Sequence, residues 1–257
     1  MQKILRKEKS SAVKQHHASD LRSTLDWLRA QGDLIETDKP VDPDLEVTGL
    51  QKHMDGGCPV LFNKVKGKPN HRVLTNLFGD IKVINKMFGW KDDAERVKKL
   101  AYALRHPLKP VEIPQHEAPC QEHVIKSPED VNEHMVAIRH TTYEPELTVG
   151  SAIRCVTGPQ FDGGSDLGYN RMNFRWGNVG TFQISPGSHM WQVVNKYYKS
   201  NERVPITMCF GVPPACTLLA GAGFDYAVLP MGCDEIGIAG AVQGAPIRLV
   251  KARTVEA

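Results

Sequence analysis

Polar side chains that could hold a metal ion occur at three distant places in the second half of the sequence. They are the run 169–176, a predicted helix start at His189, and a second helix start at Glu235. Asn170, His189 and Glu235 offer an amide oxygen, an imidazole nitrogen and a carboxylate. This mixed oxygen and nitrogen set suits Mg²⁺ or Mn²⁺, which in proteins often also contact a bound phosphate. The residue types therefore predict a divalent-metal site.

Each of these residues also has a plain structural role open to it. A histidine at a helix start can cap the helix or fill the core. Glu235 can complement the positive end of a helix dipole. The spacing alone leaves both alternatives open.

The run 169–176 has the pattern of a β-strand with one strongly polar face. Alternate residues of a strand share a face, which groups Arg171, Asn173 and Arg175. Asn170 stands at the beginning of the run, where it can turn its amide oxygen toward the predicted metal site. A guanidinium on this strand could bind a carboxylate through paired hydrogen bonds, and Arg175 is our candidate. A surface ion pair is the alternative for Arg175.

Helices and strands alternate over the first 105 residues. Asp20 can cap a first helix that Gly32 ends, and Asp44 opens a second helix that Gly56-Gly57 ends. Apolar residues at helical spacing predict helices at 81–88 and 94–104, and short apolar runs predict strands at 59–62 and 72–75.

A proline-rich connector over 106–128 separates this part from a second half that is richer in strands. We expect residues 1–19 to be a mobile basic arm, 20–127 an N-terminal α/β domain with its connector, and 128–257 a second domain. In the second domain the predicted strands are 151–157, 169–176, 181–184, 205–210 and 246–251, and the predicted helices are 188–198, 214–222 and 234–242.

Composition excludes several classes of protein. A formal net charge of +3 over 257 residues gives no basic patch for nucleic acid. The sequence has no apolar run long enough to span a bilayer and no apolar block of signal-peptide length. The six cysteines show neither a C-x-x-C pair nor zinc-binding spacing, so we expect reduced thiols in a cytoplasmic protein.

Ordered motifs along nearly the whole chain resemble the UbiD family of decarboxylases. In the first half they are Leu21-Arg22, Gly32-Asp33-Leu34, Val41-Asp42-Pro43-Asp44-Leu45-Glu46, Val60-Leu61-Phe62, Val65-Lys66-Gly67 and Asn76-Leu77-Phe78-Gly79. In the second half they are Asn170-x-x-x-x-Arg175, Ser188-His189 and Asp234-Glu235-Ile236-Gly237-Ile238-Ala239-Gly240.

The resemblance implies an α/β (α+β) fold in which an N-terminal mixed α/β domain precedes a split β-barrel that binds prenylated FMN. It implies Mn²⁺ or Mg²⁺ at the flavin phosphate, held by Asn170, His189 and Glu235, with K⁺ nearby. The implied cofactor-binding residues are Asn170, Arg171, Met172, Asn173, Phe174, Arg175, Ser188, His189 and Glu235. Arg175 matches the arginine that holds the substrate carboxylate.

The implied reaction is the reversible, non-oxidative decarboxylation of an aromatic or α,β-unsaturated acid. Such a reaction needs an electron sink that side chains do not provide, which explains the flavin. A flavin prenyltransferase would supply that cofactor.

The family's proton-delivering carboxylates lie beyond the segment that this chain matches. We therefore expect a truncated chain or one subunit of a split enzyme, in a homo-oligomer or with a C-terminal-half partner. A flavin-binding redox or carrier protein and a non-catalytic assembly subunit are the alternatives.

Overall fold

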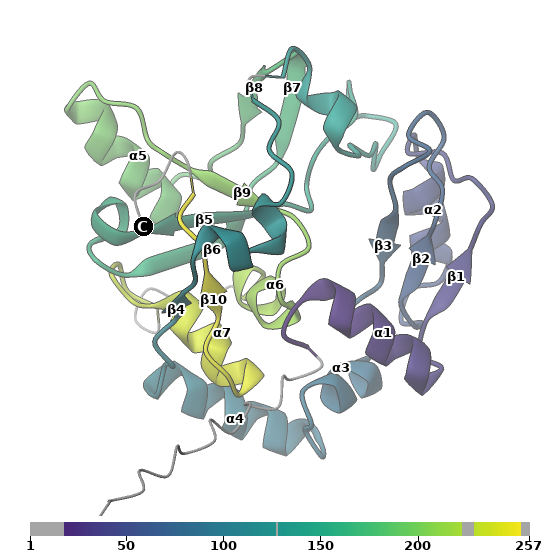
Figure 1. Ribbon diagram of the computed structural model, residues 1–257, viewed down its shortest axis with the longest axis horizontal. Helices are drawn as coiled ribbons and strands as arrows, with labels where there is room; N and C mark the ends of the chain where they lie inside the picture. The colour runs from purple at the N-terminus through teal and green to yellow at the C-terminus, as the bar shows by residue number, and fades with distance from the viewer. Residues whose placement is uncertain (1–17, 127, 223–228, 253–257) are drawn as a thin grey trace, which may run out of the picture.

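The computed structural model describes residues 18–126, 128–222 and 229–252. The predicted basic arm falls almost wholly outside these residues, so its mobility stays a prediction. The predicted α/β class is confirmed, because helices and several small sheets alternate along the chain (Figure 1).

The first helix, α1 (Leu21–Gln31), begins and ends as predicted. The Asp20 carboxylate accepts a hydrogen bond from the Ser23 backbone N–H at 2.8 Å, and Gly32 adopts φ 73° at the other end. A positive φ is costly for residues with a Cβ, so glycine suits this position.

A small three-stranded sheet follows and forms one end of the molecule together with α2 (Glu46–His53) (Figure 1). Its central strand β2 (Val60–Phe62) pairs in parallel with β1 (Ile35–Thr37) and antiparallel with β3 (Val73–Thr75). The sequence did not predict β1, which is short and half-exposed. Asp44 does not cap α2, since Leu45 is the N-cap residue, at φ 71° and without a side-chain cap.

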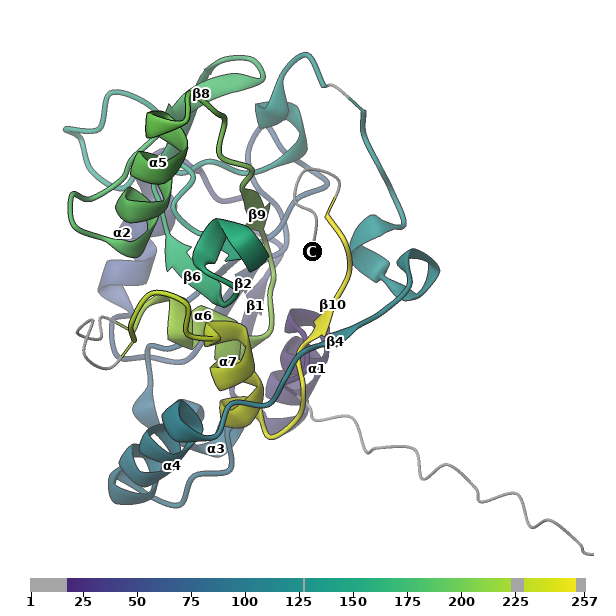
Figure 2. The same ribbon diagram turned by 90° about the vertical axis from the view of Figure 1, so that its left-hand side faces the viewer.

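Helices α3 (Ile81–Met87) and α4 (Asp93–Arg105) connect the two halves of the chain. Asp80 and Asp92 cap them. Helix α4 packs against α7 (Glu235–Gln243), which lies beside it in both views (Figures 1 and 2). One hydrophobic core contains residues of α3 and α4 together with residues of the second half, so the two halves pack against each other. The domain boundary at residue 127 stays a prediction.

The proline-rich connector is more ordered than the sequence predicts. Its strand β4 (Val111–Glu112) pairs in parallel with β10 (Arg248–Leu249), from the other end of the chain. Three short 3-10 helices follow, η1 (Gln115–Glu117), η2 (Pro119–Gln121) and η3 (Val131–His134).

The second half is built on a three-stranded antiparallel sheet with the order β6-β5-β9 (Figure 1). The strands are β5 (Ile153–Thr157), β6 (Ser165–Tyr169) and β9 (Thr207–Cys209), with η4 (Gly158–Phe161) between the first two. The predicted strand 169–176 is divided in two. Its first residue ends β6, and two residues outside any strand precede β7 (Met172–Trp176), which forms a hairpin with β8 (Val179–Phe182).

Two further helices of this half, α5 (His189–Lys199) and α6 (Pro214–Ala220), confirm the predicted positions. No helix in the described ranges combines the length and apolar character needed to cross a membrane. All six cysteines lie in the described part of the chain and are free thiols.

Candidate functional site

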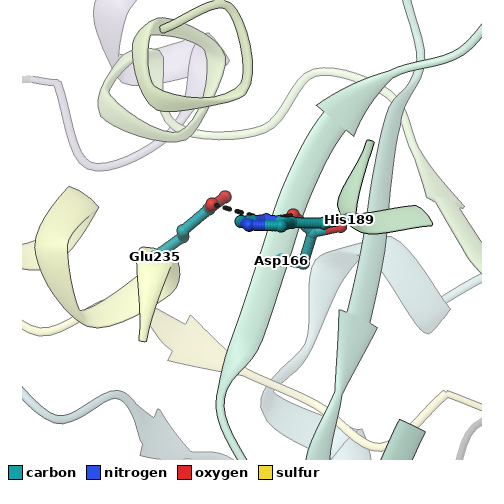
Figure 3. A group of neighbouring side chains, drawn as sticks. All are labelled: Asp166, His189 and Glu235. Carbon is teal, nitrogen blue, oxygen red and sulfur yellow. Dashed lines mark hydrogen bonds and ion pairs between the residues drawn. The ribbon is translucent and has the colours of Figure 1, made fainter. Parts of the chain in front are cut away.

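Three side chains from distant parts of the sequence meet between β6, α5 and α7. Nδ1 of His189 lies 3.2 Å from Oδ1 of Asp166 and 3.8 Å from Oε1 of Glu235. Figure 3 shows Glu235 pointing from α7 toward His189 and Asp166. Asp166 and Glu235 are buried and His189 is half-buried, so water screens this group poorly. We call Asp166, His189 and Glu235 the carboxylate–histidine cluster.

Two of these side chains stand at the first position of a helix. Ser188 caps α5, where its hydroxyl accepts from the Trp191 N–H at 3.2 Å. Asp234 caps α7, accepting from the Gly237 N–H at 2.9 Å. Capping fixes where each helix begins and therefore where His189 and Glu235 point.

A serine on β6 ties that strand to the start of α7. The Ser165 hydroxyl donates to Asp234 at 2.7 Å and accepts from the Ile236 N–H at 2.9 Å. The adjacent Leu167 N–H donates to Oε2 of Glu235 at 2.7 Å. These bonds set the strand carrying Asp166 against the helix carrying Glu235.

A buried arginine on β5 completes the surroundings. Arg154 pairs with Oδ2 of Asp166 and donates from Nε to Oδ1 of Asn170 at 2.8 Å. The side chains of Arg154 and Asp166 are only 6% and 3% exposed. Burial of two paired charges stabilises a structure only when their remaining polar groups are hydrogen-bonded. Asn170 provides such a hydrogen bond by accepting from Nε of Arg154.

The protonation of the site follows from its burial. Desolvation raises the pKa of Glu235 to about 7, although the Leu167 N–H and the charge of Arg154 act in the opposite direction. Burial lowers the pKa of His189, which favours the neutral imidazole. Burial also lowers the pKa of Arg154 to about 10, so the guanidinium is still charged at neutral pH.

The carboxylate–histidine cluster has the chemistry of a small divalent-cation site. Two carboxylates and a neutral imidazole each offer one ligand atom, and these atoms all lie within 4.8 Å of one another. Oxygen and imidazole ligands in such a set fit Mn²⁺ or Mg²⁺. The donor set therefore fits the cation that the sequence predicts.

The sequence did not identify Asp166. The available signal was a charged residue inside the buried segment Ser165–Tyr169, together with Arg154 on the neighbouring strand. A charge is almost never fully buried unless it is paired. A buried aspartate on one strand and an arginine on a neighbouring strand therefore indicate an ion pair. The strand register that brings them together is not readable from the sequence.

Asn170, the predicted amide ligand, lies beside the cluster, and its role as a cation ligand stays a prediction. Its Oδ1 accepts from Arg154, and its Nδ2 donates to the Gln183 carbonyl at 2.8 Å. Asn170 and Arg171 form the two-residue link between β6 and β7 and do not share one strand with Arg175. Strand β6 ends at Tyr169, yet the Asn170 side chain stays beside Arg154 on the neighbouring strand β5.

The other predicted residues of the run 169–176 lie on β7 of the β7–β8 hairpin, except Arg171, which directly precedes β7. Met172 and Phe174 pack in an apolar cluster, whereas Nδ2 of Asn173 donates to the Leu147 carbonyl at 3.1 Å. Arg175 is half-exposed and forms an ion pair with Glu146 at 3.0 Å. Arg171 faces Glu144, with 3.9 Å between Nη1 and Oε1.

An apolar hollow of about 260 Å³ lies beside the same hairpin. Its lining residues come from β7, β8, β9 and the residue before β9, and they are Met172, Phe174, Gly180, Thr181, Phe182, Ile206 and Met208. Apolar walls with few polar groups suit a flat ring.

Family models match almost the whole chain. Residues 25–104 match the 3-octaprenyl-4-hydroxybenzoate carboxy-lyase N-terminal domain, and residues 111–257 match the Rift-related domain of the same family. Gallate decarboxylase of Lactiplantibacillus plantarum is 31% identical over an alignment of 255 positions, which covers 92% of this chain and 51% of that protein.

Solved structures of UbiD-class enzymes have the same fold. HmfF from Pelotomaculum thermopropionicum, in an evolved dimeric form in complex with prFMN, superposes with a TM-score of 0.84 at 28% identity. The match covers 93% of this chain and 54% of HmfF. The apo 3,4-dihydroxybenzoic acid decarboxylase from Enterobacter cloacae gives 0.80 at 26% identity, over 92% and 51% of the two chains.

The chain spans about half the length of these relatives. Its second half alone matches the Rift-related family model from residue 111 to residue 257. The chain belongs to the UbiD family of carboxy-lyases.

Proposed function

We propose that this chain is the cofactor-binding half of a prenylated-FMN-dependent carboxy-lyase. The observation that carries the proposal is the buried carboxylate–histidine cluster, assembled by β6, α5 and α7. Related enzymes bind prFMN or FMN, which supports a flavin for this chain. The substrate class is an aromatic or α,β-unsaturated carboxylic acid, as the names of the related decarboxylases suggest.

A divalent cation at the flavin phosphate would be held by Asp166, His189 and Glu235. This set keeps two of the three residues that the sequence predicts and replaces Asn170 with Asp166. The supporting geometry is that the single amide oxygen of Asn170 accepts from Arg154, whereas Asp166 has a second oxygen, Oδ1, that lies 3.2 Å from His189. The cation would offset part of the negative charge that the two carboxylates and the phosphate bring together.

The bound flavin would supply the electron sink that decarboxylation at an unsaturated carbon requires. The protein's own part is to position the substrate and exclude water. The apolar hollow beside the hairpin offers a surface for an aromatic ring. A low-polarity wall of this kind strengthens electrostatic contacts to a bound carboxylate.

A guanidinium would hold the substrate carboxylate. Arg171 is our first choice, because it directly follows Asn170, which contacts Arg154 beside the buried cluster. Arg175, the residue that the sequence predicts, lies four residues farther along the chain, on β7. A planar fork with five donors suits either position.

The complete activity would need a partner that corresponds to the relatives' C-terminal half, in the same complex or the same chain. The proton donor that finishes the reaction would come from that half. A positioned general acid commonly contributes on the order of 10² to 10⁴ in rate. The isolated 257 residues would therefore bind the flavin but turn over slowly.

The test is to produce the chain together with a flavin prenyltransferase and Mn²⁺, then measure the intact mass of the extracted flavin. Release of CO₂ is assayed with aryl and α,β-unsaturated acids, including gallate and 3,4-dihydroxybenzoate, with and without a C-terminal-half polypeptide. We expect prenylated FMN in the extract and fast turnover only in the mixture. Absence of any flavin, or only the unprenylated form with no turnover in the mixture, contradicts the proposal.

A further inference from the structure

Each carboxylate of the carboxylate–histidine cluster has one of its two oxygens bound by a group from outside the cluster. Arg154 pairs with Oδ2 of Asp166, and the Leu167 N–H donates to Oε2 of Glu235 at 2.7 Å. The other oxygens, Oδ1 and Oε1, face His189 at 3.2 Å and 3.8 Å. A cation among these residues would meet one oxygen from each carboxylate.

The number of oxygens per carboxylate separates small from large divalent cations. Ca²⁺ takes six to eight oxygen ligands and commonly uses both oxygens of a carboxylate. Mg²⁺ and Mn²⁺ accept a near-octahedral set, to which each carboxylate gives a single oxygen. A protein group that occupies the second oxygen therefore disfavours Ca²⁺.

We infer that Arg154 is a specificity-determining residue that keeps Asp166 monodentate and so selects a small octahedral cation over Ca²⁺. The inference rests on the proposed cation site. It goes further by assigning a role to an arginine that contacts neither the cation position nor the substrate.

Three contacts hold Arg154 in this role. Its Nη1 pairs with Asp166, its Nε donates to Asn170 at 2.8 Å, and Gly168 lies directly opposite on β6. A Cβ at position 168 would overlap Nη2 of Arg154, so the guanidinium uses the space that the glycine leaves. The position of the guanidinium is thus fixed from three sides, which a flexible lysine ammonium would not reproduce.

The alternative is that Arg154 acts only as a counter-charge for the two carboxylates. A counter-charge would be replaced by lysine, since lysine keeps the positive charge. If Arg154 instead keeps Asp166 monodentate, lysine would not replace it, because a flexible ammonium can move away from the second oxygen of Asp166. The two explanations therefore predict different results for one conservative substitution.

The experiment measures Mn²⁺ binding to the full chain by the electron paramagnetic resonance signal of free Mn²⁺, with Ca²⁺ as competitor. The readout is the ratio of the Ca²⁺ and Mn²⁺ dissociation constants, which needs neither flavin nor turnover. We expect Arg154→Gln and Arg154→Lys each to lower this ratio about tenfold, the usual scale for residues behind metal ligands. Arg248→Gln, which removes an exposed arginine paired with Glu117, should leave it unchanged.

A paired variant makes the test reciprocal. Asparagine has one carbonyl oxygen, so Arg154→Gln with Asp166→Asn should restore the ratio to within about threefold of wild type, although both cations bind more weakly. This double variant also removes the buried Arg154–Asp166 ion pair as a whole, without leaving one of its two charges behind. If Arg154→Gln unfolds, Arg154→Lys carries the test, because it keeps the charge.

An unchanged ratio in folded Arg154→Lys, or no recovery in the double variant, overturns the inference. Failure of the underlying site looks different. In that case wild type binds no Mn²⁺, or Glu235→Gln binds it as tightly as wild type does.

Discussion

Arg154 lies opposite Gly168 in the antiparallel pair of β5 and β6, and its guanidinium occupies the space where any other residue would carry a Cβ. The strand register and the absence of a side chain thus let a buried arginine reach Asp166. We expect Gly168→Ala to displace the guanidinium and to lower stability by about 1–3 kcal/mol, the usual cost of overpacking. Chemical denaturation measures this change.

Gly49 provides the control for that substitution. It lies inside α2, where a Cβ would have open space around it, and alanine favours helix over glycine. Gly49→Ala should therefore be neutral or stabilising. Equal effects of the two substitutions would remove the steric argument for Gly168.

Removal of the Glu235 carboxylate should remove the cation. Glu235→Gln keeps the shape of the side chain but leaves the cluster with one fewer negative charge, so Mn²⁺ affinity should fall at least about tenfold. The bound metal is measured by elemental mass spectrometry after dialysis. Glu112→Gln, on an exposed strand, is the control. Full metal occupancy in Glu235→Gln would exclude Glu235 from the site.

Asp166 and Asn170 are the two candidates for the third ligand of the proposed cation site, beside His189 and Glu235. We expect Asp166→Asn to weaken Mn²⁺ binding roughly tenfold, because it removes a charge beside the cation. Asn170→Ala should change the affinity by less than about threefold, since Asn170 acts through Arg154. Titration calorimetry measures both. The opposite order of effects would return Asn170 to the role that the sequence predicts.

Arg171 and Arg175 are distinguished by activity in the mixture with a C-terminal-half polypeptide. We expect Arg171→Lys to lower kcat/KM at least about tenfold while flavin binding and thermal stability are retained, because lysine lacks the bidentate fork. Arg175→Lys should change kcat/KM little, since Arg175 forms a half-exposed ion pair with Glu146. A large loss for Arg175→Lys with normal Arg171→Lys activity would reverse the assignment.

The cysteines should differ widely in reactivity. Burial raises the pKa of Cys155 to about 12 and that of Cys209 to about 11, and it also raises the pKa of the buried Cys216. Only the thiolate is alkylated quickly, so the exposed Cys120 should react with iodoacetamide at pH 8 well before these three. Peptide mass spectrometry over time identifies the labelled residues. Labelling of Cys216 in the native protein as fast as Cys120 would contradict the described packing.

Local signals in the sequence were enough to predict most elements and two members of the candidate site. They sufficed where they are strong, as for the capped helix α1, which ends at Gly32. The helix starts that carry His189 and Glu235 were predicted for the same reason, because capping depends on neighbours in the chain. Motif resemblance predicted the family, which the family models confirm.

Tertiary contacts alone determine which residue completes the cluster with His189 and Glu235. The predicted strand 169–176 is divided after Tyr169, and Asn170 contacts Arg154. Asp166 enters the cluster through the pairing of β5 with β6 and the packing of α7 on β6. Strand register and helix packing depend on contacts between segments far apart in the chain, and a one-residue shift would turn each side chain to the other face of the sheet. Local sequence patterns do not encode that choice.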